Sequence, residues 1–504
     1  MKIQLKNIFK IRGRRHTKRN ESNPNIHYEV DSMIKDFLGK YSKMPLEKIL
    51  ANNFIRKNLL KKADEKLKQI LLSCKKYPAH VQEDKYYMVK NLVKTVNDAY
   101  ENARTAPSVK KALINSFAIN IYLKKKENLE RFQNEFGRNP PSFLAISPTK
   151  FCNLKCTGCY ANSSSETSES LDWDVLDRII TEKTNLWNSY FTVISGGEPF
   201  LYKSQSKSIL DLARNHPENY FLVYTNGTLI DKQMARELAD IGNITPAISI
   251  EGFENETNTR RGPGVYEKTM DAMGHLRKEK IPFGISLTAT KNNADLVVSD
   301  RVMDFYFQDC KVSYAWIFQL MPIGRADSLE MMVTPDQRVK MFRQTQHLIR
   351  DKQYFIADFW NSGCVSNGCI SAGKDSGYLY IDWNGNITPC VFNPYSPVNI
   401  IDIYRRGGTL SDSLKEPFFI AIQEWQKQYA LDRKANEMGN LITPCAIKDH
   451  YNVMLQFLKK HNPKPIDEAA KVALHDTDYQ KGLIQYGEKI HDATSEIWKN
   501  EYLR

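Results

Sequence analysis

The sequence predicts an α/β protein built from parallel strand–helix units, and three observations indicate this. From Phe143 onward, short apolar runs alternate with helical patterns, as parallel strands joined by helices do. Residues 28–137 before them show helical periodicity. A cysteine-rich loop directly follows the first apolar run, at the strand end where such folds collect functional residues. The expected strands are Leu144–Ser147, Tyr190–Ile194, Phe221–Thr225, Ala247–Ile250, Phe283–Thr288 and Tyr314–Leu320.

Length and composition narrow the class of protein. The 504 residues are enough for two or three domains. No apolar run reaches the length of a membrane span, so the chain is not expected to be transmembrane. The first residues lack the apolar core of a secretory signal. Nine cysteines in a chain of this size indicate metal ligands in a reducing compartment rather than a disulfide framework, so we expect a cytoplasmic protein.

Changes of pattern along the chain predict five parts. A helical region is followed by the strand–helix region, then by a segment in which cysteines return, and finally by further helices. The expected boundaries are 1–27 for a basic, disordered tail, 28–137 for the helical region, 140–350 for the strand–helix region, 360–446 for the second cysteine region and 450–504 for the C-terminal helices.

The N-terminal tail carries much of the formal net charge of +13, because its first twenty residues hold eight Lys or Arg and no acid. Such a block of like charge predicts a solvated, disordered segment. Apolar residues between the charges, such as Ile8 and Phe9, leave open a weak contact with an anionic surface through a short interfacial helix. Nucleic acid is an unlikely partner because no recognition motif accompanies the charge.

The loop after the first strand carries Cys152, Cys156 and Cys159, in the spacing C-x3-C-x2-C. A four-iron cluster normally takes four protein thiolates, one for each iron. Three local cysteines therefore suggest a cluster with one iron left open for a small molecule. Zinc is the competing metal, but structural zinc sites have four Cys or His ligands, and no His lies near this loop.

A second motif, Ser195-Gly196-Gly197-Glu198-Pro199, follows the second strand. Taken alone, it fits an ordinary tight turn. Paired glycines also let backbone groups approach a ligand closely, and Glu198 provides a carboxylate acceptor.

Together the two motifs resemble the signatures of radical S-adenosylmethionine (radical SAM) enzymes. The resemblance implies a partial (β/α)6 TIM-like barrel and a [4Fe-4S] cluster held by Cys152, Cys156 and Cys159, whose open iron binds SAM. Reduction would then cleave SAM to a 5'-deoxyadenosyl radical. The family usually has an aromatic residue just before the third cysteine, whereas this chain has Gly158 there and Tyr160 after it.

Weaker matches follow the next strands. Asn226 resembles a residue near the SAM ribose, Ser249 belongs to a Ser-x-Glu-Gly segment with Glu251 in place of the usual Asp, and Arg261 resembles a residue that helps hold the SAM carboxylate. For each of these, a surface loop or helix cap is an equally good interpretation. The SAM contacts that the resemblance implies are Tyr160, Gly196, Gly197, Glu198, Pro199, Asn226, Ser249 and Arg261. After the sixth strand, Pro322-Ile-Gly324-Arg325-Ala326 is similar to a segment frequent in members with auxiliary clusters.

The cysteines return at Cys364, Cys369, Cys390 and Cys445, around a predicted hairpin with its turn at Asn384-Gly385. The spacing resembles the opening of the SPASM/twitch auxiliary-cluster domain, but the later cysteine run of a full SPASM domain is absent. This similarity implies a small C-terminal domain with one auxiliary [4Fe-4S] cluster, for which four thiolates would be a complete ligand set. Whether Cys364 is a ligand or a packing thiol stays open. Cys74 and Cys310 are interpreted as structural.

These patterns predict a radical SAM oxidoreductase that abstracts a substrate hydrogen, with a peptide or protein side chain as the first choice of substrate. The alternative substrate is a tetrapyrrole or another small metabolite. A non-enzymatic iron–sulfur electron carrier explains the cysteines but gives the Gly-Gly-Glu-Pro loop no purpose, and a zinc-stabilised nucleic-acid binder rests on charge alone. An electron donor such as flavodoxin or ferredoxin is expected, and no catalytic acid or base is assigned.

Overall fold

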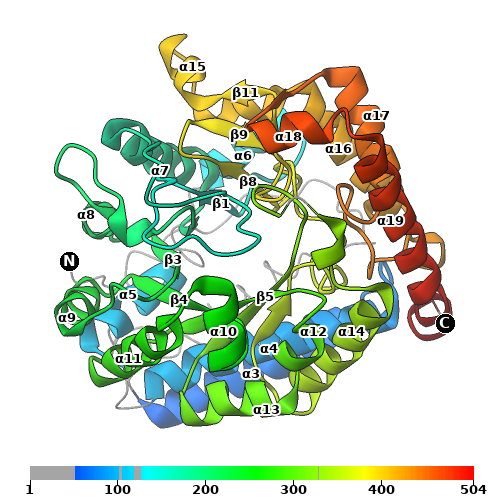
Figure 1. Ribbon diagram of the computed structural model, residues 1–504. Helices are drawn as coiled ribbons and strands as arrows, with labels where there is room; N and C mark the ends of the chain where they lie inside the picture. Colours follow the sequence, from blue (N-terminus) through cyan, green and yellow to red (C-terminus); the bar gives the residue numbers. More distant parts are fainter. Residues whose placement is uncertain (1–51, 102–104, 119–125, 327, 504) are drawn as a thin grey trace.

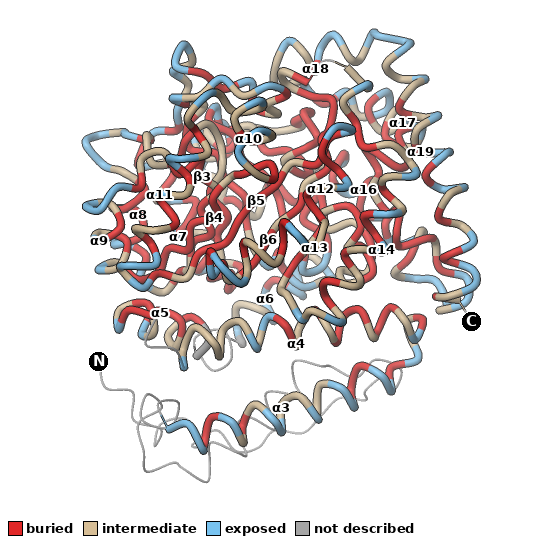
Figure 2. The backbone as a smooth tube through the Cα atoms, turned by 60° about the horizontal axis from the view of Figure 1, so that its bottom comes forward, coloured by how far each residue is buried: buried red, intermediate tan, exposed pale blue. Residues whose placement is uncertain are grey.

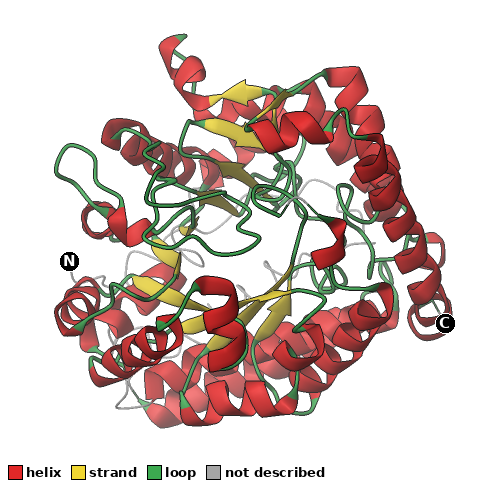
Figure 3. Ribbon diagram, viewed as in Figure 1, coloured by secondary structure: helices red, strands yellow, loops and turns green. Residues whose placement is uncertain are grey.

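The computed structural model describes residues 52–101, 105–118, 126–326 and 328–503, and the predicted basic tail lies outside them. Its centre is a mixed sheet in the order β11-β9-β8-β1-β2-β3-β4-β5-β6-β7, in which neighbours from β8 through β7 pair in parallel. Helices surround the strands (Figures 1 and 3). The prediction of an α/β fold with a central parallel sheet is confirmed.

All six predicted strands are present, with ends that differ by up to three residues from those expected. A seventh strand extends the sheet beyond β6, and β8 extends it beyond β1. The parallel strands are β1 Phe143–Ile146, β2 Phe191–Ile194, β3 Tyr220–Thr225, β4 Ile244–Ile250, β5 Gly284–Ala289, β6 Tyr314–Gln319, β7 Ile356–Asp358 and β8 Tyr378–Ile381. The connecting helices are α7 Trp173–Trp187, α8 Ile209–Asn215, α9 Lys232–Ile241, α10 Glu254–Arg261, α11 Val265–Lys278, α12 Ala294–Val297, α13 Asp300–Asp304 and α14 Pro335–Arg350.

The two faces of the parallel strands have different surroundings. The face that meets the helices is fully buried, as at Ile248, Ile285 and Ile317. Residues that alternate with these point inward, and several of them, including Tyr224 and Phe318, are only half-buried. The rings of Tyr224 on β3 and Phe318 on β6 lie 5.5 Å apart although two strands separate them in the sheet. Since neighbouring strands are about 4.8 Å apart, the sheet must curve around its inner face.

The N-terminal helices are α3 Asn53–Ser73, α4 Ala79–Glu101, α5 Pro107–Ala118 and α6 Lys126–Phe136. Figure 2 shows α4 and α5 beneath the body and α3 beneath α4. Asn91 on α4 donates to the carbonyls of Ile349 and Tyr354 at 2.8 and 3.0 Å. Val109 on α5 packs against Tyr220, the first residue of β3. These helices therefore cover the end of the sheet where the parallel strands begin, opposite the cysteine loop.

The predicted hairpin is formed by β8 and β9 Asn386–Thr388, which pair antiparallel, and β11 Val398–Asn399 extends it. Asp382 accepts from the backbone N–H of Asn384 and Asn386 at 2.9 Å, and Gly385 has φ +81° at the turn. This hairpin belongs to the central sheet, because β8 pairs in parallel with β1 along Phe143–Ile146. The sequence pattern placed it in a region apart from the strand–helix units, since a hairpin is recognised from local residues and its pairing with β1 is not.

The rest of the chain packs around this hairpin. The remaining strands, β10 Tyr395–Ser396 and β12 Lys464–Pro465, form a small separate sheet. The C-terminal helices are α15 Ile400–Arg405, α16 Pro417–Gln426, α17 Tyr451–His461, α18 Glu468–Ala473 and α19 Thr477–Ile497. Among the described residues, no helix combines the length and apolarity that crossing a membrane requires.

Candidate active site

The loop after β1 brings the first three cysteines together. Burial raises the pKa of Cys152 to about 12, and the nearby charges of Glu198, Cys156 and Cys159 add to that rise. The thiols of Cys156 and Cys159 therefore lie near that of Cys152. Metal ligation would offset the cost of ionising Cys152, because bound thiols are deprotonated. The donor set therefore fits an iron–sulfur cluster. Within the described ranges, no three His, Cys, Asp or Glu side chains converge enough to hold a single metal ion, whereas a four-iron cluster binds each thiolate through a different iron.

Gly158 departs from the family pattern for a steric reason. Its φ is +65°, and a Cβ there would lie 3.0 Å from Leu320 and 3.2 Å from Met331. A side chain at this position would have to adopt a left-handed conformation against side chains of the neighbouring loop. The aromatic ring comes instead from Tyr160, whose hydroxyl lies 2.8 Å from that of Ser195.

The segment after β6 holds the cysteine loop in place. Arg325 donates to the carbonyls of Cys156 at 2.7 Å and Ser163 at 2.6 Å, and its backbone N–H donates to the carbonyl of Cys159 at 2.9 Å. Gly324 has φ +66°, and a Cβ there would lie 2.2 Å from the carbonyl oxygen of Tyr160. Sequence reasoning identified this motif but missed its contact with the cysteine loop, because residues 169 positions apart share no local signal.

The Gly-Gly-Glu-Pro loop packs directly against the cysteine loop. A Cβ on Gly196 would lie 2.5 Å from the carbonyl oxygen of Thr149, and one on Gly197 would lie 2.1 Å from that of Phe151. The backbone N–H of Gly197 donates to Thr149, and that of Glu198 to Phe151, both at 2.9 Å. The glycines thus allow two backbone segments to touch, which is a role that the sequence pattern did not predict.

Glu198 is fully buried between the ends of β2 and β3. Its carboxylate accepts from the backbone N–H of Phe200 at 3.2 Å, from the Thr225 hydroxyl at 2.8 Å and from the backbone N–H of Asn226 at 2.8 Å. Burial raises its pKa to about 7, although these hydrogen bonds favour the charged form. The next residue, Pro199, begins a 3-10 turn over Pro199–Leu201.

Asn226 connects the end of β3 to the first cysteine. Its side-chain N–H donates to Asn153 at 2.8 Å and approaches the Cys152 sulfur at 3.9 Å, while its carbonyl accepts from Thr228. Ser249, at the end of β4, lies on the inner face with its hydroxyl 3.0 Å from that of Ser286.

Arg261, which is predicted to hold the SAM carboxylate, is paired within the chain, as is its neighbour Arg260. Arg260 and Arg261 both contact the buried Glu251 carboxylate, with Arg261 Nε at 2.9 Å. Burial disfavours the charge on Arg261, but Glu251 together with the thiols of Cys156 and Cys159 outweighs that cost and raises its pKa. Glu251 thus forms ion pairs with both Arg260 and Arg261 beside the cysteine loop.

The second cysteine group consists of Cys369, Cys390 and Cys445. Burial raises the pKa of Cys390 to about 12, and the charge of Cys369 adds to it. Burial also raises the pKa of Cys445, with further contributions from Asp449, Cys369 and Cys390. The chain therefore brings together three thiols that are up to 76 residues apart in sequence.

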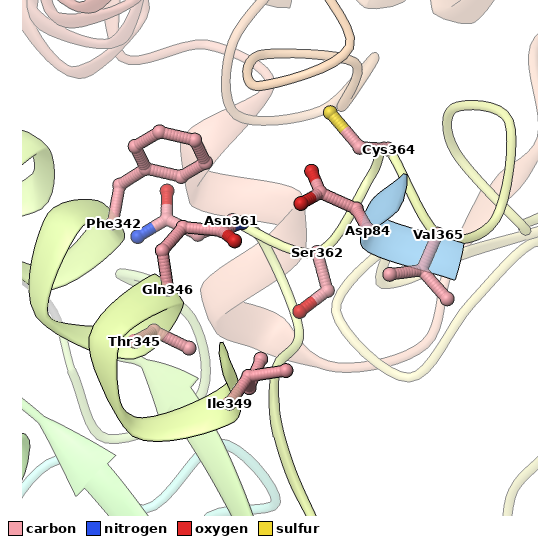
Figure 4. A pocket seen from close by; sticks show the side chains of 9 residues that line it. All are labelled: Asp84, Phe342, Thr345, Gln346, Ile349, Asn361, Ser362, Cys364 and Val365. Atoms are coloured by element: carbon pink, nitrogen blue, oxygen red, sulfur yellow. The ribbon is translucent and has the colours of Figure 1, made fainter. Parts of the chain in front are cut away.

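Cys364, predicted as a fourth member, has other neighbours. It belongs to a separate apolar cluster with Leu441 and Trp498, and burial and the charge of Asp84 raise its pKa. Figure 4 shows its thiol beside Asp84 in the small hollow that Phe342 also lines. The Cys364 thiol therefore lies beside Asp84 of α4, a position that depends on tertiary packing.

The loop that carries Cys445 is fixed by a buried ion pair that sequence reasoning missed. Arg338 on α14 and Asp449 are fully buried partners, and Arg338 also donates to the carbonyl of Ile442 at 3.0 Å. The second oxygen of Asp449 accepts from the backbone N–H of Cys445 at 3.1 Å. An Asp four residues after a cysteine carries no signal of its own, so only the structure identifies this contact.

Comparison with known proteins identifies the region around the first cysteine group. Residues 146–297 match the model of the radical SAM superfamily. The AdoMet-dependent heme synthase of Methanosarcina barkeri is 30% identical over 203 residues, which are 39% of this chain and 56% of that protein. A cysteine-type anaerobic sulfatase-maturating enzyme of Clostridium perfringens is 25% identical over 312 residues, which are 55% of this chain and 80% of that protein.

Solved structures with this fold include the following one. Streptococcus suis SuiB bound to its precursor peptide SuiA superposes with a TM-score of 0.50 at 15% identity, over 70% of this chain and 80% of that one. The chain spans 56% and 53% of the length of the first curated relatives that it matches. The predicted family is confirmed: this chain contains a radical SAM domain, and its three-cysteine loop and Gly-Gly-Glu-Pro loop lie within that domain.

Proposed function

We propose that the chain is a radical SAM oxidoreductase that modifies a peptide or protein side chain. The observation that carries this proposal is the cysteine loop itself, because Arg325 and the Gly-Gly-Glu-Pro segment hold the backbone that carries its three cysteines through hydrogen bonds. When bound and reduced, a four-iron cluster supplies the electron that cleaves SAM to methionine and a hydrogen-abstracting 5'-deoxyadenosyl radical.

Different residues of this chain would bind the cluster and SAM. Cys152, Cys156 and Cys159 would hold the cluster, and Arg325 would fix the backbone that carries the last two. The SAM-binding set keeps the residues expected from the resemblance, which are Tyr160, Gly196, Gly197, Glu198, Pro199, Asn226, Ser249 and Arg261. Because Arg261 is paired with Glu251, it would bind the SAM carboxylate while remaining anchored.

A second site would use Cys369, Cys390 and Cys445 for one auxiliary four-iron cluster in a SPASM/twitch-like arrangement on the hairpin. Their mutual electrostatic influence supports this set, and the surroundings of Cys364 argue against adding it. Three ligands would leave one iron open. The domain division given by the sequence stays part of the proposal, with the hairpin of the second cysteine region joined to the central sheet. A partial (β/α)6 barrel and an external electron donor such as flavodoxin or ferredoxin also stay part of it.

A peptide substrate is supported by the sulfatase-maturating relative and by the fold shared with SuiB in complex with its precursor peptide. A tetrapyrrole is the second candidate, since the Methanosarcina barkeri relatives at 30% and 26% identity are an AdoMet-dependent heme synthase and an Fe-coproporphyrin III synthase.

Reductive cleavage of SAM tests the proposal. The anaerobically reconstituted and reduced protein is expected to form 5'-deoxyadenosine and methionine, measured by chromatography. Cys156→Ala should abolish both products, because the cluster would lose one of its three ligands. Cys310→Ala, which removes a buried cysteine outside either group, is the matched control and should retain cleavage. Cleavage that persists in Cys156→Ala, or zinc without iron and sulfide in the purified protein, would refute the assignment.

A further inference from the structure

Partly exposed aromatic side chains line part of the inner face of the sheet, near the carboxyl ends of the strands. Tyr224 is the penultimate residue of β3, Phe318 lies near the end of β6, and Phe359 directly follows β7. All three are half-buried, whereas the outward-facing Ile317 and Asp358 beside them are fully buried. The interior side of the sheet at this level is therefore open enough for solvent to reach the rings.

These rings belong to one connected cluster, which we name the aromatic wall and define as Tyr160, Tyr224, Phe318, Phe359 and Phe392. Phe392 is buried, and the other four are half-buried. The ring centroids of Tyr224 and Phe318 are 5.5 Å apart, those of Phe318 and Phe359 are 5.7 Å apart, and those of Phe359 and Phe392 are 5.4 Å apart. Tyr160 joins through Phe392 at 6.0 Å. Offset and edge-to-face contacts at these distances stabilise rings in fixed positions.

The aromatic wall lies between the two cysteine groups. Tyr160 directly follows Cys159 of the first group, and Phe392 is two residues after Cys390 of the second. The contact between these two rings therefore joins the two sites. A substrate that reacts between the sites would touch this wall.

The aromatic wall is electrically neutral. The Tyr160 hydroxyl is hydrogen-bonded to Ser195, and tyrosine side chains are uncharged near neutral pH because their usual pKa is about 10. The neighbouring cation, Lys448, sits over the ring of Trp360 at 4.4 Å and donates to Gln319. An uncharged aromatic wall favours apolar and aromatic ligand groups, as most small-molecule sites do.

The adjoining part of the inner face is polar but uncharged. Ser249 and Ser286 lie side by side on β4 and β5, and Thr288 on β5 is the register partner of Phe318. Their hydroxyl groups suit a peptide backbone, which needs both donors and acceptors. Arg260 and Arg261, the cations near this edge, are already paired with Glu251.

We propose that the aromatic wall binds an aromatic or large aliphatic side chain of the peptide substrate and holds it between the two cysteine groups. This inference rests on the proposed function and adds the class of residue that is modified. A tetrapyrrole has a flat apolar ring as well, but its several carboxylate groups require cations. Near this edge Arg261 is assigned to the SAM carboxylate, and Arg260 is paired with Glu251.

Photocrosslinking tests this binding directly on the full-length protein, reconstituted and without added SAM. The probe is N-acetyl-4-benzoylphenylalaninamide, and the labelled peptides are mapped by mass spectrometry. We expect labelling on the segments that carry Phe318, Phe359 or Phe392, and competition by N-acetyltryptophanamide at concentrations at least several-fold below those needed with N-acetylserinamide.

Variants connect the labelling to the wall. Phe318→Leu and Phe359→Leu, which keep an apolar side chain, should each lower this labelling at least threefold. The matched control is Phe54→Leu, on the exposed face of α3 with 74% exposure, and it should leave the labelling unchanged. Two results with the wild-type protein alone would overturn the proposal. One is labelling confined to other segments, and the other is competition by N-acetylserinamide that equals that by N-acetyltryptophanamide.

A tetrapyrrole would give a different result. If coproporphyrin III binds in a manner that Phe318→Leu weakens, while the aromatic amides neither label nor compete, the substrate class proposed here is wrong. A protein that cleaves SAM but fails the crosslinking test would retain the proposed function and lose only this inference, so the two failures are distinguishable.

Discussion

The two cysteine groups are built in different ways. Cys152, Cys156 and Cys159 come from a single loop of eight residues, whereas Cys369, Cys390 and Cys445 come from three separate segments. The first group is held by neighbouring loops, through the turn at Gly324–Arg325 and the Gly-Gly-Glu-Pro segment. The second depends on the β8–β9 hairpin and on the buried pair of Arg338 and Asp449. A local group survives rearrangement elsewhere, but a dispersed group requires the whole C-terminal part to be folded.

The largest effect is expected from breaking the ion pair behind the second group. Arg338→Met would leave Asp449 charged, buried and without its partner, which costs about 3–5 kcal/mol of the free energy of unfolding. Urea unfolding measures this change. Arg343→Met removes a surface pair with Glu501 and should cost only about 0–1 kcal/mol. Equal losses in the two variants would contradict the role assigned to the buried pair.

The next largest loss of stability is expected at the Gly324–Arg325 turn, which holds the first cysteine group in place. Gly324→Ala adds a Cβ that would lie 2.2 Å from the Tyr160 carbonyl, in a left-handed conformation, and we expect a loss of about 3–4 kcal/mol because the strain and the clash add. SAM cleavage should fall with it.

Gly407→Ala is the matched control for this substitution. Gly407 is also left-handed, at φ +76°, but no atom lies within 4 Å of the added Cβ. Its cost should be about 1 kcal/mol, the strain alone. Similar losses of unfolding free energy in the two variants would show that the contact of Gly324 with the cysteine loop does not contribute to stability.

Ionisation of Glu198 is expected to change the free energy of unfolding with pH by about 3 kcal/mol at most. Its pKa in the folded state is about 7, above the ordinary value of 4.5. Between these two values the unfolded chain loses its proton while the folded chain retains it, so this residue lowers the free energy of unfolding as pH rises from about 4.5 to 7. Glu198→Gln cannot ionise, and its unfolding free energy, measured at pH 5 and pH 7.5, should fall less than that of the wild-type chain. The same fall in both proteins would contradict the assignment.

Sequence reasoning succeeded where the signal is local. The strands around Val193 and Ile248, the turn at Gly385 and the three-cysteine loop each follow from the identity and spacing of neighbouring residues. It could not identify contacts that join distant segments. Cys364 is five residues from Cys369 yet points toward Asp84 on α4, and nothing in the local pattern distinguishes it from a ligand.

The partners of Glu251 and Glu198 were missed for the same reason. Glu251 differs from the usual Asp by one methylene, and its pairing with two arginines depends on how α10 is placed. Pairing of β8 with β1 is likewise invisible in the sequence, because the two strands are more than 230 residues apart.

The most direct test of the two-site account is the iron and sulfide content of a variant that lacks the first group. With Cys152, Cys156 and Cys159 all changed to alanine, the reconstituted chain is expected to retain about four irons and four sulfides at the second group. In that background Cys445→Ala should lose or degrade the cluster, and Cys364→Ala should retain it. A variant free of iron, or one that loses its iron through Cys364→Ala and keeps it through Cys445→Ala, would contradict the account.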